Sequence, residues 1–109
     1  MERSTYHSIL EDINGLRNLQ EINKIGQCRV CSKAIMEMVK LNFPQVLVEA
    51  REVNLEPDLQ HTFLRITIDN KKPFLIDEVG SAKYPPYAGY ESEAPEHLQN
   101  SRADIINNY

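Results

Sequence analysis

The sequence predicts an α+β fold, in which a helical layer packs on a small antiparallel sheet. Apolar residues recur every three or four positions in the first 42 residues, as in helices, and every second position in much of 45–79, as in strands. The predicted strands have short connections, which favour antiparallel neighbours. With 109 residues, the chain has the size of one small domain. We therefore expect a single domain over 1–109, in which 81–109 form a loop-rich tail that wraps the body.

Two helices are predicted before residue 43. The first carries apolar residues at helical spacing, and Gly15 is expected to divide it into two short helices; this pattern comprises Ile9, Ile13, Leu16, Leu19 and Ile22. The second is predicted over residues 27–42, because the residue before Pro44 avoids the helical conformation. Its apolar face comprises Val30, Cys31, Ala34, Ile35, Met38, Val39 and Leu41.

Three strands are predicted after Pro44, over 45–53, 61–68 and 73–79. Residues 54–60 are expected to form a loop and 69–72 a turn. In the second strand the alternation places Leu64, Ile66 and Ile68 on one face, and His61, Phe63 and Arg65 on the other. The tail after Gly80 is rich in proline and tyrosine, and a short helix is expected near residues 95–102.

Composition and charge narrow the classes of partner. The formal net charge is −4 and no run of Lys or Arg forms a basic patch, so we expect no nucleic-acid partner. No apolar stretch approaches the length of a membrane span, and we expect no membrane partner. The first residues lack the basic start and apolar run of a signal peptide, which predicts a cytoplasmic protein. Export by a route without a cleaved signal stays open, as does the oligomeric state.

The two cysteines, Cys28 and Cys31, lie at the start of the second predicted helix. A C-x-x-C pair at a helix N-terminus is typical of thiol–disulfide oxidoreductases, although that motif normally follows a strand. As zinc ligands the two thiols would be half of a site, and no histidine pair at ligand spacing completes it. Cys31 belongs to the apolar face and is expected to be a core residue. Cys28 lies in the first turn, where the helix dipole stabilises a thiolate.

A nucleophilic cysteine needs a base, and the base needs an orienting group. His61 begins the second predicted strand, and Asp77 lies near the end of the third. Each alone is typical of a surface or strand-ending residue. Cysteine on a helix, histidine on a strand and aspartate on the next strand form a more specific order. We therefore predict catalytic roles for Cys28, His61 and Asp77.

The stretch of roughly residues 20–85 resembles the transglutaminase-like superfamily of papain-related cysteine enzymes. The segment "GQCRV" at 26–30 is similar to the transglutaminase nucleophile motif G-Q-C-W-V-F. The segments "HTFLRI" and "PFLIDEVG" resemble the histidine and aspartate strands of that superfamily. They are also similar to arylamine N-acetyltransferases, which have the same triad order and a D-V-G-F-G segment. The resemblance implies a transglutaminase-like core with a Cys-His-Asp triad.

The chain also departs from these families. Arg29 replaces the tryptophan after the nucleophile, and the chain has no tryptophan to help bind an oxyanion. Thr62 and Phe63 follow the histidine in place of an Ala-Trp pair, and the acetyltransferase R-G-G-x-C-x-E pattern is absent. The resemblance therefore predicts the catalytic triad but does not predict the substrate.

The expected function is cysteine-dependent acyl transfer on a protein or peptide amide, through a thioester on Cys28. Hydrolysis, glutamine deamidation and transamidation all use this intermediate, and none needs a cofactor or a metal. Two alternatives stay open. An inactive transglutaminase-like core could serve as a binding module, with Tyr84, Tyr87 and Tyr90 at its contact surface. The C-x-x-C pair could act in thiol–disulfide exchange.

The triad also predicts a strand register. Side chains alternate between the two faces of a sheet. His61 and Asp77 therefore share a face only if Asp77 lies an even number of positions from the residue that pairs with His61. For the two to lie directly opposite, Ile66 must pair with Lys72 and Leu64 with Phe74, around a five-residue loop, 67–71. A two-residue turn at 70–71 would place them on opposite faces. The first turn of the second helix must then lie against the face that carries His61.

Overall fold

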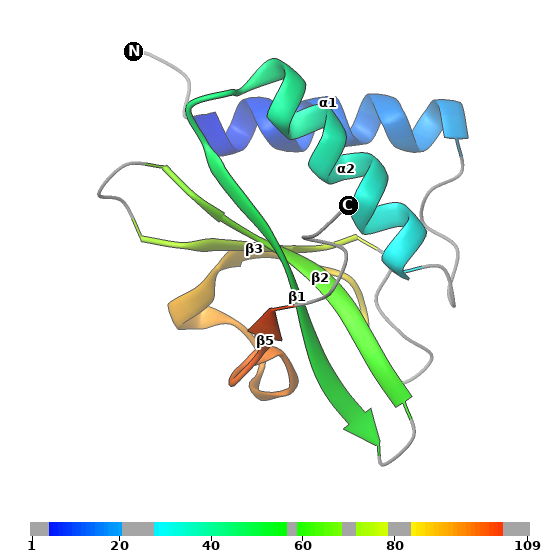
Figure 1. The fold of residues 1–109 in the computed structure, drawn as a ribbon, viewed down its shortest axis with the longest axis vertical. Helices are drawn as coiled ribbons and strands as arrows, with labels where there is room; N and C mark the ends of the chain where they lie inside the picture. The colour runs from blue at the N-terminus through cyan, green and yellow to red at the C-terminus, as the bar shows by residue number, and fades with distance from the viewer. Residues whose placement is uncertain (1–4, 21–27, 57–58, 69–71, 79–83, 104–109) are drawn as a thin grey trace.

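Two helices cover one face of an antiparallel sheet in the computed structural model (Figure 1). The structure describes residues 5–20, 28–56, 59–68, 72–78 and 84–103. Within them the helices are α1 (Thr5–Gln20) and α2 (Cys28–Asn42). The strands are β1 (Leu47–Glu56), β2 (Leu59–Thr67), β3 (Phe74–Asp77), β4 (Tyr87–Tyr90) and β5 (Arg102–Ala103), in the order β4-β3-β2-β1-β5. The predicted α+β class is confirmed.

Helix α1 continues through Gly15, so the predicted division into two helices is wrong. Ile9 and Ile13 are buried against the core and hold the helix in place. A glycine inside a helix costs only about 0.5–1 kcal/mol, which this burial outweighs. Of the predicted apolar pattern, the side chains of Leu16 and Leu19 and the whole of Ile22 lie outside the described part of the chain.

Helix α2 ends at Asn42, as Phe43 and Pro44 predict. Its buried apolar residues are Cys31, Ile35, Met36 and Val39, of which Met36 was not predicted. Val30 and Leu41 were predicted on the apolar face, but they are 67% and 81% exposed. They lie eleven residues apart, about three turns, and so share the side of the helix that faces away from the sheet.

The hairpin between β1 and β2 is longer than predicted. Asn54 pairs with Gln60 and Glu56 with Leu59, so most of the expected loop 54–60 is strand. A register shift between Asn54 and Glu56 accommodates the change near the turn. Pairing along a neighbouring strand here overrides the weak strand propensity of asparagine and glutamate.

The C-terminal segment, residues 84–103, contains two strands that the sequence analysis missed. Strand β4 has the sequence Tyr-Ala-Gly-Tyr and pairs with β3, while β5 pairs with β1 at the opposite edge. β4 lacks the aliphatic alternation by which strands are recognised, but its Tyr90 packs edge-on against Phe74. The short helix expected near 95–102 is a single 3₁₀ turn, η2 (Glu96–Leu98), and η1 (Glu91–Glu93) precedes it.

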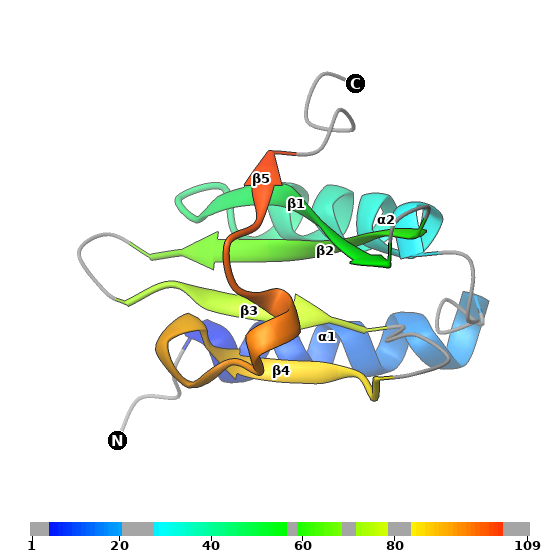
Figure 2. The same cartoon turned by 90° about the horizontal axis from the view of Figure 1, so that it is seen from below.

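The C-terminal segment crosses the sheet on the face opposite the helices (Figure 2). Its Leu98 is 1% exposed and forms a second, smaller core with Val53, Phe63 and Leu75. Polar contacts add to this packing: Arg65 of β2 binds Glu91, and Arg102 binds Glu52. The central strands are thus buried on both faces, which explains the continuous apolar run Phe74-Leu75-Ile76.

Candidate active site

His61 and Asp77 form a buried contact on the sheet. His61 is the third residue of β2, Asp77 is the last of β3, and they are 4% and 2% exposed. The distance from His61 Nε2 to Asp77 Oδ1 is 2.8 Å, which is a hydrogen bond. The two residues that the sequence analysis singled out on neighbouring strands are therefore in direct contact.

The strand register has the parity that this contact requires, but not the predicted pairing. Ile66 pairs with Phe74 and Leu64 with Ile76, so the predicted pairs of Ile66 with Lys72 and Leu64 with Phe74 are wrong. The connection is longer by two residues than predicted, and an even shift leaves each side chain on its predicted face. Asp77 is thus a diagonal neighbour of His61 rather than its direct opposite.

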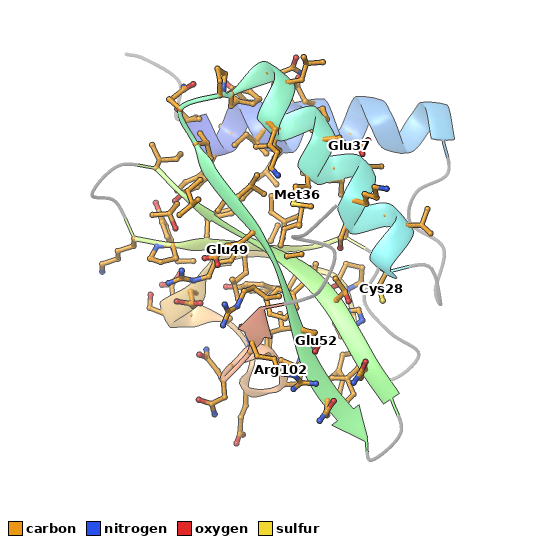
Figure 3. The ribbon with its side chains drawn as sticks, in the orientation of Figure 1. Cys28, Met36, Glu37, Glu49, Glu52 and Arg102 are labelled. Atoms are coloured by element: carbon orange, nitrogen blue, oxygen red, sulfur yellow. The ribbon has the colours of Figure 1, made fainter. Side chains whose placement is uncertain are left out.

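Cys28 begins α2 and is half-buried. One turn later, the hydroxyl of Ser32 donates to the backbone carbonyl of Thr62, at 3.5 Å, which fixes the start of the helix against β2. Figure 3 shows Cys28 at this end of α2, beside β2. The thiol is a hydrogen-bond partner of the His61 side chain. Since Asp77 occupies Nε2 of the ring, Nδ1 is the nitrogen available to Cys28.

The helix does not meet His61 in the way that was predicted. Strand alternation places His61 and Asp77 on the face of Phe63, which the C-terminal segment covers. The residues of α2 pack on the other face, so the expected position of its first turn is wrong. Contact with His61 arises instead at the beginning of β2, where Ser32 and Thr62 bring the helix end to the strand.

The electrostatics of His61 are dominated by its two partners. Burial lowers the pKa of His61, but hydrogen bonds to Asp77 and Cys28, and the negative charges of both, raise it from 6.5 to about 9. An imidazole with this pKa is protonated at neutral pH. The described first turn of α2 contains no acidic residue to oppose a negative charge on Cys28.

Cys31 lies in the core, as predicted. It is 2% exposed and packs among apolar residues of both helices and the sheet, whereas Cys28 is half-buried. Neither forms a disulfide bond. Among the residues that the structure describes, no three His, Cys, Asp or Glu side chains are grouped so as to hold a metal ion.

His97 is a further polar residue at this site. It lies in η2, and its ring stacks on that of Tyr84 with the centroids 3.8 Å apart. The charges of both Asp77 and His61 act on it. From the sequence, histidines other than His61 were weighed only as zinc ligands, and His97 was not singled out. Nothing in the spacing of a loop-rich tail predicts which strand it will cover.

Comparison of the chain with protein-family models, with curated proteins and with solved structures found no match. In the described part of the chain, neither helix has the length and apolar character needed to cross a membrane.

Proposed function

We propose that this protein is a cysteine-dependent acyltransferase or hydrolase of the transglutaminase-like class, acting on a protein or peptide amide. One observation carries the proposal: the same buried imidazole, His61, is hydrogen-bonded to Asp77 on one side and to Cys28 on the other. A thiol, a base and an orienting carboxylate in this arrangement are the parts that nucleophilic catalysis needs.

In the proposed reaction, Cys28 acts as the thiolate and His61 as the imidazolium. The sulfur attacks the amide carbon, and the developing oxyanion accepts a hydrogen bond from the backbone N–H of Cys28. The C–N bond then breaks, and the leaving amine or ammonia takes the proton of His61. Water or an acceptor amine next attacks the thioester while His61 removes its proton. This step releases the acid or the new amide and regenerates the thiolate.

The role of Asp77 follows from its contact with Nε2 of His61. A buried carboxylate at this nitrogen fixes the ring so that Nδ1 faces the sulfur, and it stabilises the imidazolium charge. The raised pKa of His61 supports this role, because the charged ring exists at neutral pH in spite of its burial.

The exposure of the three residues favours a large substrate. His61 and Asp77 are buried beneath the C-terminal segment, whereas Cys28 is half-buried at a helix end. An acyl group reaches the sulfur from that end, and a chain of this size has little room for an enclosed pocket. A peptide segment laid across the start of α2 fits this arrangement better than an enclosed small molecule.

The proposal is tested by incubating candidate proteins and peptides with the wild type and with Cys28→Ala, followed by mass spectrometry. Deamidation gives the mass increase of an amide converted to an acid, hydrolysis gives fragments, and transamidation gives conjugates. We expect one of these with the wild type and none with Cys28→Ala. Identical spectra for the two, with a Cys28 thiol no more reactive than an ordinary one, would favour the inactive binding module.

A further inference from the structure

The anchoring of Leu98 brings His97 to the buried pair of His61 and Asp77. Leu98 is the residue after His97 in η2 and is 1% exposed. It packs against three residues that flank the pair on the same face of the sheet, namely Val53, Phe63 and Leu75. Val53 is the register partner of His61, and Leu75 precedes Asp77 by two positions. A side chain next to Leu98 is therefore held over the pair.

The ring of His97 is fixed in place, and one of its nitrogens is buried. It stacks on the ring of Tyr84, and the angle between the two ring planes is 9°. Its Nε2 has no hydrogen-bond partner within the described ranges. Burying a polar atom without a partner costs about 1–3 kcal/mol, so a well-packed imidazole in this position calls for a partner.

The charges around His97 identify that partner. Burial lowers the pKa of His97; the positive charge of His61 lowers it further, and the negative charge of Asp77 raises it. His97 therefore stays neutral while His61 is charged, and a neutral imidazole has one N–H to donate. His61 cannot accept it, because its two nitrogens are used by Asp77 and Cys28. A carboxylate accepts several hydrogen bonds, so Asp77 is the acceptor that remains in this group.

We propose that His97 is a positioning residue: as a neutral imidazole with its proton on Nε2, it donates a hydrogen bond to the carboxylate of Asp77 through one buried water molecule. This contact holds the carboxylate in line with His61 and completes a Cys28-His61-Asp77-His97 series. The inference rests on the proposed function, because such positioning has an effect only where Cys28 is activated.

Two substitutions distinguish the effect of the N–H donor of His97 from the effect of its ring packing. His97→Phe keeps the ring on Tyr84 but removes the donor, whereas His97→Gln keeps an N–H donor near the same position and removes the ring. His7→Phe is the matched control, since His7 is on α1 and its side chain is 58% exposed. One readout is the alkylation rate of Cys28 by iodoacetamide. The other is the proton NMR signal of His61 Nε2–H, assigned by its loss in His61→Ala.

We expect His97→Phe to slow alkylation by about tenfold or more, the effect of losing one hydrogen bond to a charged group. The His61 Nε2–H signal should shift or broaden. His97→Gln should stay much closer to the wild type in both readouts. The control, His7→Phe, should match the wild type. A role in packing alone would give the opposite order of the two variants. If His97→Phe does not fold, His97→Leu against His97→Gln makes the same comparison.

The inference is overturned if His97→Phe alkylates at the wild-type rate with an unshifted NMR signal, or if His97→Gln is as slow as His97→Phe. Failure of the proposed function has a different result. In that case, Cys28 of the wild type is alkylated no faster than Cys28 of the His61→Ala variant. The substitutions at position 97 then leave the alkylation rate unchanged as well.

Discussion

At the residue scale, opposing effects on His61 decide what Cys28 can do. Burial disfavours the charged imidazole, and it is the largest single effect on the pKa of His61. The hydrogen bonds and charges of Asp77 and Cys28 together outweigh it, and the pKa rises to about 9. A charged ring in the interior thus depends on both partners, so the titration of His61 directly measures its interactions with Asp77 and Cys28.

Asp77→Asn should reduce the pH dependence of stability. The raised pKa of His61 gives stability that is fully present below pH 6.5 and is lost as the pH rises through about 9. Without the carboxylate the pKa of His61 falls, and the stability that is lost as the pH rises becomes smaller. We expect urea unfolding of the wild type to show a larger drop in the free energy of unfolding between those two pH values than the variant shows. Equal drops would mean that Asp77 does not stabilise the imidazolium.

Cys31→Ser should affect stability rather than reactivity. Cys31 is 2% exposed in the apolar core, so a hydroxyl there is expected to cost roughly 1–3 kcal/mol. Chemical denaturation measures this cost, and iodoacetamide labelling of Cys28 should keep its wild-type rate. A stable variant with impaired thiol chemistry would instead point to thiol–disulfide exchange between the two cysteines.

At the scale of the elements, the sequence predicts what local pattern controls. The helices and the first three strands follow from periodicity, and the face shared by His61 and Asp77 follows from parity. The particular register does not, because every shift by two residues preserves the alternation. Strand β4 and the position of His97 depend on long-range packing of a segment without apolar periodicity, and no local pattern encodes that packing.

The attachment of η2 to the sheet should depend on one side chain. Leu98→Ala leaves a cavity among the residues of the second core and is expected to lower the free energy of unfolding by about 2–4 kcal/mol. Leu41→Ala is the matched control, since Leu41 is 81% exposed and its change should stay within about 0.5 kcal/mol. Thermal or urea unfolding compares the two. Similar effects at both positions would mean that Leu98 does not anchor the segment.

At the scale of the whole molecule, the central strands are covered on both faces. The consecutive residues Phe63 and Leu64 are each fully buried, one under the C-terminal segment and the other under the helices. Neither layer alone shields the sheet from water. The site depends on both layers, since α2 carries Cys28 and the C-terminal segment covers His61 and Asp77.

The two layers should therefore unfold together. Three of the five tyrosines, Tyr84, Tyr87 and Tyr90, belong to the C-terminal segment, so tyrosine fluorescence follows mainly this segment. Labelling of Cys31, in a Cys28→Ala background, follows the core between the helices and the sheet. We expect the two probes to give the same urea midpoint, as in a two-state transition. A lower midpoint for fluorescence would show that the C-terminal segment detaches first.

The central claim is that His61 activates Cys28, and the alkylation rate of Cys28 at about pH 6 tests it most directly, because an ordinary thiol is almost wholly protonated there. Wild type and His61→Ala are compared, with Cys31→Ala in both so that a single thiol is labelled. We predict that the wild-type thiol reacts with iodoacetamide at least about tenfold faster, even after allowing for the lower nucleophilicity of a stabilised thiolate. Equal rates in the two proteins would contradict the claim, whatever the distance between the side chains.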